Sequence, residues 1–139
     1  MGSAELTREA LTAWGRVFGA SLEAPRLITL EGDLGAGKTT LVQAIAAGFG
    51  ITEPVTSPTY ALVQSYASPK GVLHHLDLYR LRDASQLAQL GWDDLLRDRA
   101  IVCIEWPERA GAELPKARTA FTLAHLSATP EVRRLTWTD

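Results

Sequence analysis

The sequence predicts an α/β fold in which a mixed, mostly parallel central sheet is flanked by helices and completed by antiparallel strands. Three observations support this fold class. A short apolar strand leads through a glycine-rich loop into a helix over residues 26–47. A second continuous apolar run covers residues 100–105, as expected for a strand buried on both faces. Near the end of the chain, residues 118–138 contain two alternating segments that are typical of antiparallel strands.

Length and composition indicate one domain over residues 1–139. Of these residues, 46% are hydrophobic and 22% are charged, which suits a single core but leaves no room for a large second domain. The net charge of -2 gives no electrostatic reason to expect autonomous nucleic-acid binding. Cys103 is the one cysteine, so no intrachain disulfide is possible. No segment has the apolar pattern of a signal peptide or a membrane span, so we expect a cytoplasmic protein.

Helix and strand are expected to alternate in the first part of the chain. Residues 5–22 have apolar side chains at helical spacing, which predicts an amphipathic helix. Residues 26–30 form the first buried strand, and residues 40–47 form a helix that glycines end near residue 50. The segment 51–59 contains two prolines and several hydroxyl groups, which predicts a polar loop.

The remaining elements are short, and glycine or proline separates several of them. They are expected to be strands 60–66 and 72–79, helices 82–90 and 92–97 with a break at Gly91, strand 100–105, and an antiparallel edge of strands 118–124 and 133–138.

The glycine-rich loop has the pattern of a phosphate-binding loop. Four residues separate Gly32 from Gly37-Lys38-Thr39, which matches G-x-x-x-x-G-K-[ST]. Backbone N–H groups of such a loop surround a phosphate chain, and the following helix directs its positive end at the same anion. We therefore expect a P-loop NTPase domain that binds a nucleoside triphosphate and magnesium, although a chance glycine turn before a helix is the alternative. The expected binding residues are Asp33, Leu34, Gly35, Ala36, Gly37, Lys38, Thr39 and Thr40.

Two carboxylates are candidates for holding the metal or positioning water. Glu105 and Asp77 each follow an apolar segment, at the strand ends where open α/β sheets bind ligands. Either residue is alternatively a surface acid. His74 and His75 are adjacent in a strand and point to opposite faces, so a structural or solvated role is favoured over shared metal binding. Trp106 packs either against a nucleotide or partner, or in the core.

Four motifs together resemble the TsaE (YjeE) family, the small ATPase of bacterial tRNA threonylcarbamoyladenosine biosynthesis. They occur in order at residues 32–40, 55–60, 75–81 and 104–109. The resemblance covers about residues 11 to 137. It implies a P-loop ATPase fold that uses ATP and Mg²⁺, and a role beside the TsaB–TsaD pair that transfers a threonylcarbamoyl group to tRNA. Contact with tRNA is then indirect, and no membrane is involved.

The resemblance also implies roles for individual residues. Lys38 holds the phosphates, Thr39 and Glu105 hold magnesium, Asp77 positions water, residues 57–59 form a switch-like loop, Trp106 lies beside the nucleotide, and Arg133 loosely matches a late nucleotide-contacting arginine. One position departs from the pattern, because Leu11 stands where the family usually has a threonine near the nucleobase. Thr12 is the candidate substitute.

Three other functions compete with this interpretation. A small-molecule kinase of the P-loop class needs a lid with arginines, which the segment around residues 81–99 supplies. A GTPase switch is disfavoured because its base-reading Asn-Lys-x-Asp motif needs an asparagine, and the chain has none. A nucleotide-dependent interaction module without turnover is distinguished by substitution of Asp77 and Glu105.

Overall fold

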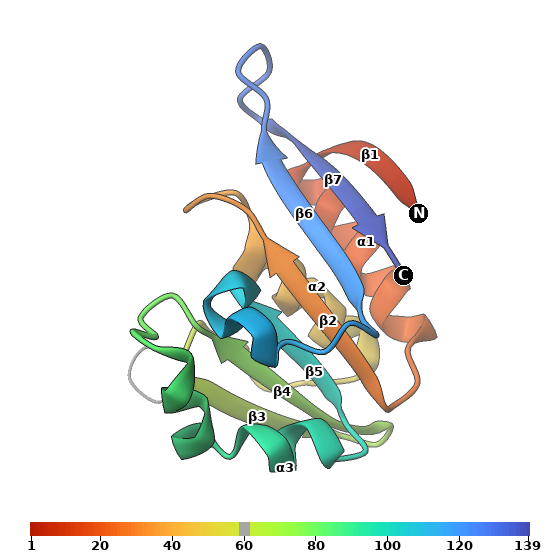
Figure 1. Cartoon of the computed structure of the whole chain (residues 1–139). Coiled ribbons are helices and arrows are strands. Elements are labelled where there is room, and N and C mark those ends of the chain that lie inside the picture. The colour runs from red at the N-terminus through yellow and green to blue at the C-terminus, as the bar shows by residue number, and fades with distance from the viewer. Residues whose placement is uncertain (59–61) are drawn as a thin grey trace.

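The computed structural model describes residues 1–58 and 62–139, and within them seven strands form one sheet in the order β1-β7-β6-β2-β5-β4-β3 (Figure 1). The strands are β1 (Gly2–Thr7), β2 (Arg26–Glu31), β3 (Val63–Ser68), β4 (Gly71–Asp77), β5 (Ile101–Glu105), β6 (Thr119–His125) and β7 (Val132–Thr138). The helices are α1 (Arg8–Ser21), α2 (Lys38–Phe49) and α3 (Trp92–Arg97), with 3₁₀ helices η1 (Ala84–Leu90) and η2 (Pro107–Glu113).

The sheet is mixed as predicted, with parallel central strands and antiparallel strands on either side. Strand β2 runs parallel to β5 and β6, and β4 runs parallel to β5. Within the described residues, the other three pairings, β1 with β7, β6 with β7 and β3 with β4, are antiparallel. Parallel pairing is confined to the four central strands. Short connections join β3 to β4 and β6 to β7, which favours antiparallel pairing, whereas β1 and β7 come from opposite ends of the chain.

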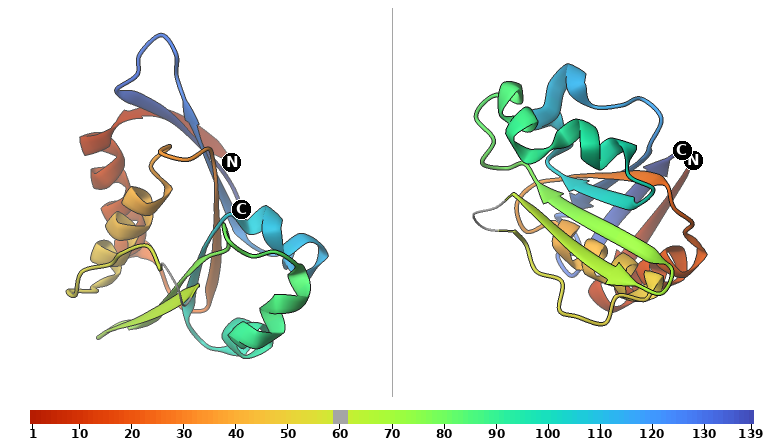
Figure 2. Two further views of the ribbon diagram at one scale, coloured as in Figure 1. Left: turned by 90° about the vertical axis from the view of Figure 1, so that its left-hand side faces the viewer. Right: turned by 90° about the horizontal axis from the view of Figure 1, so that it is seen from below.

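Helices cover both faces of the sheet. Figure 2 shows α1 and α2 on one face and η1, α3 and η2 on the other. All five residues of β5 are buried, as its continuous apolar run predicts. The larger hydrophobic cluster includes side chains from α1, α2, β2 and β6, and the smaller one includes side chains from β4, β5, η1 and α3. The sheet therefore has a core on each side, and its central strands are held rigidly.

Glycines allow α1 and α2 to pack closely. A Cβ atom on Gly19 would overlap the backbone carbonyl of Ile45 in α2. Similarly, a Cβ atom on Gly48 would overlap the backbone carbonyl of Arg16 in α1. The two backbones thus approach to a distance that larger residues do not permit.

The predicted helix over residues 5–22 is wrong at its start. Residues 5–7 belong to β1, which pairs with β7 at the edge of the sheet. Helix α1 begins after Thr7, whose hydroxyl accepts a hydrogen bond of 3.2 Å from the Ala10 backbone N–H. Because β1 is stabilised by a strand that lies 125 or more residues away in sequence, its local pattern does not reveal it.

Most other elements are confirmed within a few residues. Helix α3 has the predicted bounds, and Gly91 separates it from η1 as expected. The first residues of the strand expected at 60–66 lie outside the described residues, and β3 begins at Val63. Strands β6 and β7 pair as predicted, but β1 and not β7 is the edge of the sheet. Helix η2 was not predicted. No helix in the described ranges is long and apolar enough to cross a membrane.

Candidate functional site

The glycine-rich loop joins the end of β2 to the start of α2. Gly35 and Gly37 have φ angles of 77° and 105°, a left-handed backbone that favours glycine. Gly37 is the N-cap of α2 and makes no side-chain capping bond. The first backbone N–H groups of α2 therefore face the loop, as an anion-binding helix end requires.

Lys38 is folded against this loop. It is only 4% exposed, and its Nζ donates hydrogen bonds to the carbonyl oxygens of Gly32 at 2.5 Å and Asp33 at 2.9 Å. Burial lowers the pKa of the Lys38 ammonium, and the charges of Glu105 and Asp77 offset part of that fall. A bound polyanion would favour the charged form of Lys38 more strongly than the loop carbonyls do.

Glu105 lies directly beside Thr39. The Thr39 Oγ1 is 3.0 Å from both carboxylate oxygens of Glu105, to which its hydroxyl donates. Glu105 is the last residue of β5 and is 2% exposed. The structure thus brings together the two residues that the sequence predicts as metal ligands.

Asp77 ends β4 and is the register partner of Glu105 in the neighbouring strand. Its Oδ2 accepts a hydrogen bond of 2.9 Å from the Ser57 hydroxyl, and its Oδ1 accepts one of 3.0 Å from the Tyr79 backbone N–H. Ser57 belongs to the predicted switch-like loop at 57–59, of which residue 59 lies outside the described residues. Strand β4 and this loop therefore meet at Asp77.

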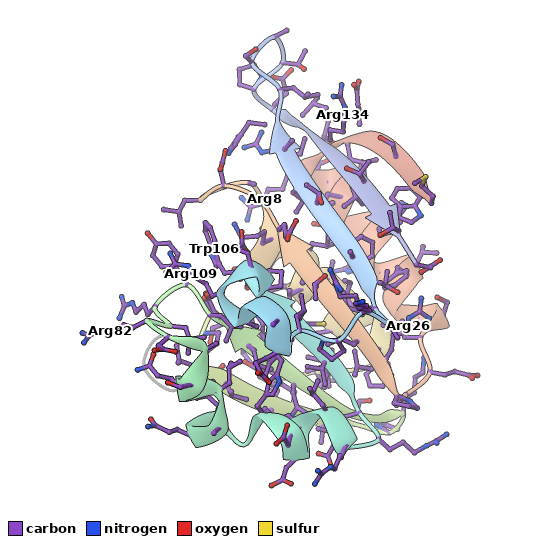
Figure 3. The ribbon with its side chains drawn as sticks, in the orientation of Figure 1. Arg8, Arg26, Arg82, Trp106, Arg109 and Arg134 are labelled. Carbon is purple, nitrogen blue, oxygen red and sulfur yellow. The ribbon has the colours of Figure 1, made fainter. Side chains whose placement is uncertain are left out.

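Trp106 covers Lys38. It follows β5 in a left-handed conformation, with φ 57° and ψ 50°, which is uncommon for a residue with a side chain. The Lys38 Nζ lies 4.3 Å from the centre of the indole ring. The centres of the Tyr79 and Trp106 rings are 4.9 Å apart. Arg109 places its guanidinium carbon 5.7 Å from the Tyr79 ring centre. In Figure 3, Trp106 and Arg109 lie on the same side of the molecule.

These groups surround a first cleft of about 310 Å³. Of the predicted residues, those that line it are Leu34, Gly35, Gly37, Lys38, Thr39, Thr40, Asp77, Glu105 and Trp106. The structure therefore gathers these residues around one cleft. Tyr79 was not predicted, although its position two residues after Asp77 was a usable signal.

A second cleft of about 390 Å³ adjoins the same loop. Arg8, Leu11, Glu131 and Arg133 line it together with loop residues, including the predicted Ala36. Arg8 begins α1 and lies beside the loop in Figure 3. Arg133 is thus near the loop as expected. Among the described residues, the lining includes Leu11 and not Thr12.

The two histidines lie on opposite faces of β4, as predicted. The His74 ring contacts the Ser65 hydroxyl at 2.7 Å and the Asp98 carboxylate at 3.1 Å, near α3. The His75 Nε2 contacts the Glu105 Oε2 at 2.6 Å inside the protein. Sequence reasoning missed this contact, although residues 75 and 77 share one face of a strand.

The donor set fits a hard cation that is shared with a ligand. Within the described ranges, no group of three or more His, Cys, Asp or Glu side chains is arranged to hold a metal by itself. The Thr39 hydroxyl and the Glu105 carboxylate supply oxygen, which magnesium prefers. Magnesium also commonly takes its other ligands from substrate phosphates and water. These oxygens therefore fit the chemistry of a magnesium ion that is shared with a bound ligand.

Comparison with known proteins identifies related sequences. A family model described as threonylcarbamoyl adenosine biosynthesis protein TsaE matches residues 6–135. A Nostoc protein named tRNA threonylcarbamoyladenosine biosynthesis protein TsaE is 45% identical over 105 residues, which cover 73% of this chain and 65% of that protein, slightly under two thirds of its length. A Treponema pallidum protein of the same name is 37% identical over 114 residues, 82% of this chain and 84% of that protein.

A solved structure has a similar fold. The crystal structure of Bacillus subtilis YdiB aligns with a TM-score of 0.78 and 27% sequence identity. The alignment covers 98% of this chain and 84% of that chain. The arrangement of helices and the mixed sheet described above is therefore present in an experimentally determined structure.

Proposed function

The chain belongs to the TsaE family, and from that premise we propose that it is a magnesium-dependent ATPase required for tRNA N6-threonylcarbamoyladenosine modification. The observation that supports this most strongly is the contact of the Thr39 hydroxyl with both oxygens of Glu105, next to a buried lysine on a glycine-rich loop. A serine or threonine and a strand-end acid that meet at such a loop are the arrangement that holds Mg²⁺ on nucleotide phosphates in P-loop enzymes.

The two clefts define the orientation that we expect for ATP. Both adjoin the loop between β2 and α2, because Gly35, Gly37 and Thr40 line each of them. The terminal phosphate belongs in the first cleft, where Lys38 and the metal-binding oxygens lie. The nucleoside then extends into the second cleft, where Leu11 offers an apolar surface and Arg8, Glu131 and Arg133 offer polar groups.

Thr39 and Glu105 would hold the magnesium ion. When bound, this ion would neutralise negative charge on the phosphates. Lys38 would turn its ammonium from the carbonyls of Gly32 and Asp33 toward the phosphates. Trp106 lies above Lys38 and would exclude water from that side of the phosphate chain.

Asp77 is the residue that we expect to position the attacking water. Its carboxylate lies beside the metal-binding Glu105 and is oriented by hydrogen bonds from Ser57 and Tyr79. A carboxylate fixed in this way accepts a hydrogen bond from the attacking water. The water molecule then directs a lone pair of its oxygen toward the phosphorus atom. Ser57 would connect this position to the loop at residues 51–58.

We expect the TsaB–TsaD pair to be the partner of this ATPase. The relatives from Nostoc and Treponema are named for tRNA threonylcarbamoyladenosine biosynthesis, and the family's ATPase acts beside that pair. The net charge of -2 agrees with an indirect role for tRNA. ATP hydrolysis would reset the transferase complex between cycles.

A small-molecule kinase remains the competing function. It would need arginines that close over ATP, and the candidate segment supplies Arg82 among others. In Figure 3, Arg82 points away from the molecule, so this arginine does not support the alternative. The two functions differ in product: a kinase transfers phosphate to an added metabolite, whereas the proposed ATPase releases phosphate with water alone.

The test is a set of three variants measured for ATP binding and phosphate release. Lys38→Ala is expected to weaken binding by at least about 30-fold, equivalent to ~2 kcal/mol. Asp77→Asn and Glu105→Gln are expected to retain the fold and lose turnover. Exposed Asp93→Asn and Glu53→Gln are matched controls with unchanged turnover. Unchanged binding in Lys38→Ala, or unchanged turnover in both acid variants, would show that the site is assigned incorrectly.

A further inference from the structure

His75 is a buried polar side chain that contacts the proposed metal site from behind. Its side chain is 0% exposed, and that of Glu105 is 3% exposed. The His75 Nε2 lies 2.6 Å from the Glu105 Oε2. His75 is on β4 and Glu105 is on β5, so the contact joins adjacent parallel strands. No role described above for the cleft residues uses this histidine.

The proposed metal site fixes the direction of this hydrogen bond. A carboxylate that ligates magnesium is deprotonated and only accepts hydrogen bonds, so the His75 Nε2 would carry the proton and donate it. The other ring nitrogen, Nδ1, is buried and has no hydrogen-bond partner in the described part of the chain. Among the described residues, the His75 ring therefore contacts Glu105 and does not connect Glu105 to a further polar group.

The carboxylate of Glu105 depends on this donor once a metal binds. Its side-chain partners among the described residues are the Thr39 hydroxyl and His75. If the Thr39 oxygen ligates magnesium through a lone pair, its proton is still free to donate to an oxygen of Glu105. His75 is the partner of Glu105 that is not itself a proposed metal ligand, so it fixes the Oε2 atom independently of the ion, and burial makes an unpaired orientation of this carboxylate costly.

We propose that His75 is a positioning residue of the magnesium site, which orients the Glu105 carboxylate toward the metal by donating a hydrogen bond from Nε2. This inference rests on the proposed magnesium–ATP function. Hydrogen bonds to ligating carboxylates set metal affinity, and their loss typically costs about 10–100-fold. The consequence is specific: His75 affects how tightly magnesium joins the nucleotide complex, whereas the loop that binds phosphate is unaffected.

The experiment measures binding of a non-hydrolysable ATP analogue by titration calorimetry, first with EDTA and then over a magnesium series. The variants are His75→Leu, His75→Gln and His75→Asn. The Gln amide nitrogen reaches about as far as Nε2, whereas the Asn amide nitrogen reaches only the Nδ1 position. Gln and Asn are therefore a matched polar pair that differ in reach. His74→Leu, on the opposite face of β4, is the control, and circular dichroism monitors folding.

The expected result is an increase of at least 10-fold in the magnesium concentration needed for tight analogue binding in His75→Leu and His75→Asn. Affinity in EDTA stays as in wild type, and His75→Gln recovers much of the loss. The Gln and Asn pair keeps the test valid if His75→Leu does not fold. Unchanged magnesium dependence in all three variants contradicts the proposal. An equal loss with and without magnesium also contradicts it, because that result indicates a purely structural role.

Failure of the proposed function gives a different result. In that case wild-type protein itself binds the analogue equally well in EDTA and in magnesium, or does not bind it. If the wild type responds to magnesium and the His75 variants respond identically, only the role of His75 is rejected.

Discussion

Lys38 is the residue whose ionisation is most directly connected to ligand binding. Burial lowers its pKa below the ordinary value of 10.5. As pH rises through this lowered pKa, free protein loses the ammonium charge that attracts phosphate. Bound triphosphate favours the protonated form, so binding in this range takes up a proton. Affinity should therefore be constant at lower pH and fall in an alkaline range that begins below the ordinary lysine pKa.

This prediction is tested by measuring analogue affinity as a function of pH. Exposed Lys116→Gln is the control and should retain the alkaline loss. Lys38→Ala should bind weakly at every pH and show no such loss. If the wild-type affinity stays constant up to a pH near the ordinary lysine pKa, burial does not lower the pKa of Lys38 as described.

Cys103 should be chemically inert in the folded protein. Its side chain is fully buried in β5, and burial together with the nearby Glu105 charge raises the pKa of the thiol to about 12. The reactive thiolate is therefore scarce, and reagents do not reach it. With iodoacetamide at about pH 8, mass spectrometry should detect no modification of native protein and one modification after denaturation. Rapid labelling of native protein would indicate that the centre of the sheet opens.

Side chains that belong to a local sequence pattern could be predicted from the sequence. Lys38 and Thr39 follow the loop pattern directly, and Asp77 and Glu105 are at the ends of strands, so local reasoning was sufficient. The contact of His75 with Glu105 was not predicted in this way, because it depends on which side chain of the adjacent strand faces the histidine.

At the scale of elements, the close packing of α1 on α2 gives a stability prediction. Gly19→Ala would force a methyl group against the Ile45 carbonyl. Overpacking of this kind costs ~1–3 kcal/mol, which exceeds the gain of up to ~1 kcal/mol in helix propensity. Urea denaturation should show a lower free energy of unfolding. Val17→Ala, at an exposed position of the same helix, is the control and should differ little from wild type. Equal stability of Gly19→Ala would mean that the helices can separate freely.

Elements with strong local patterns were predicted, and those that depend on distant partners were not. The β2 strand, the α2 helix and β5 have continuous or periodic apolar sequences that indicate their state. Strand β1 has only six residues and is ordered by pairing with β7. Helix η2 is a short 3₁₀ helix of seven residues that follows β5 almost directly, and its Pro107 suits the first turn of a helix.

Considered as a whole, the molecule gathers its chemistry at one end of the sheet. The loop after β2 and the carboxyl ends of β4 and β5 meet there, as expected for parallel central strands. Helices cover the two faces (Figure 2), so the clefts at this end are supported by a packed scaffold. Leu34, in the loop at this end, is 65% exposed. A partner that approaches this end would meet the first cleft directly.

The central claim concerns an ATPase that works with the transferase pair. A site that lacks a charge-stabilising group in isolation can be slower by factors of about 10³–10⁵, so partners are expected to matter for the rate. Contact at the end of the sheet that holds the first cleft would allow a partner to supply such a group. The isolated chain is therefore expected to hydrolyse ATP slowly.

The most direct measurement is the rate of ATP hydrolysis by the purified chain, alone and with TsaB–TsaD from the same organism. We predict slow hydrolysis by the chain alone and strong stimulation by the pair. Glu105→Gln should abolish the stimulated rate, whereas the exposed Glu53→Gln should retain it. Absence of both stimulation and complex formation would contradict the account, and the chain would then be a nucleotide-binding protein whose reaction lies elsewhere.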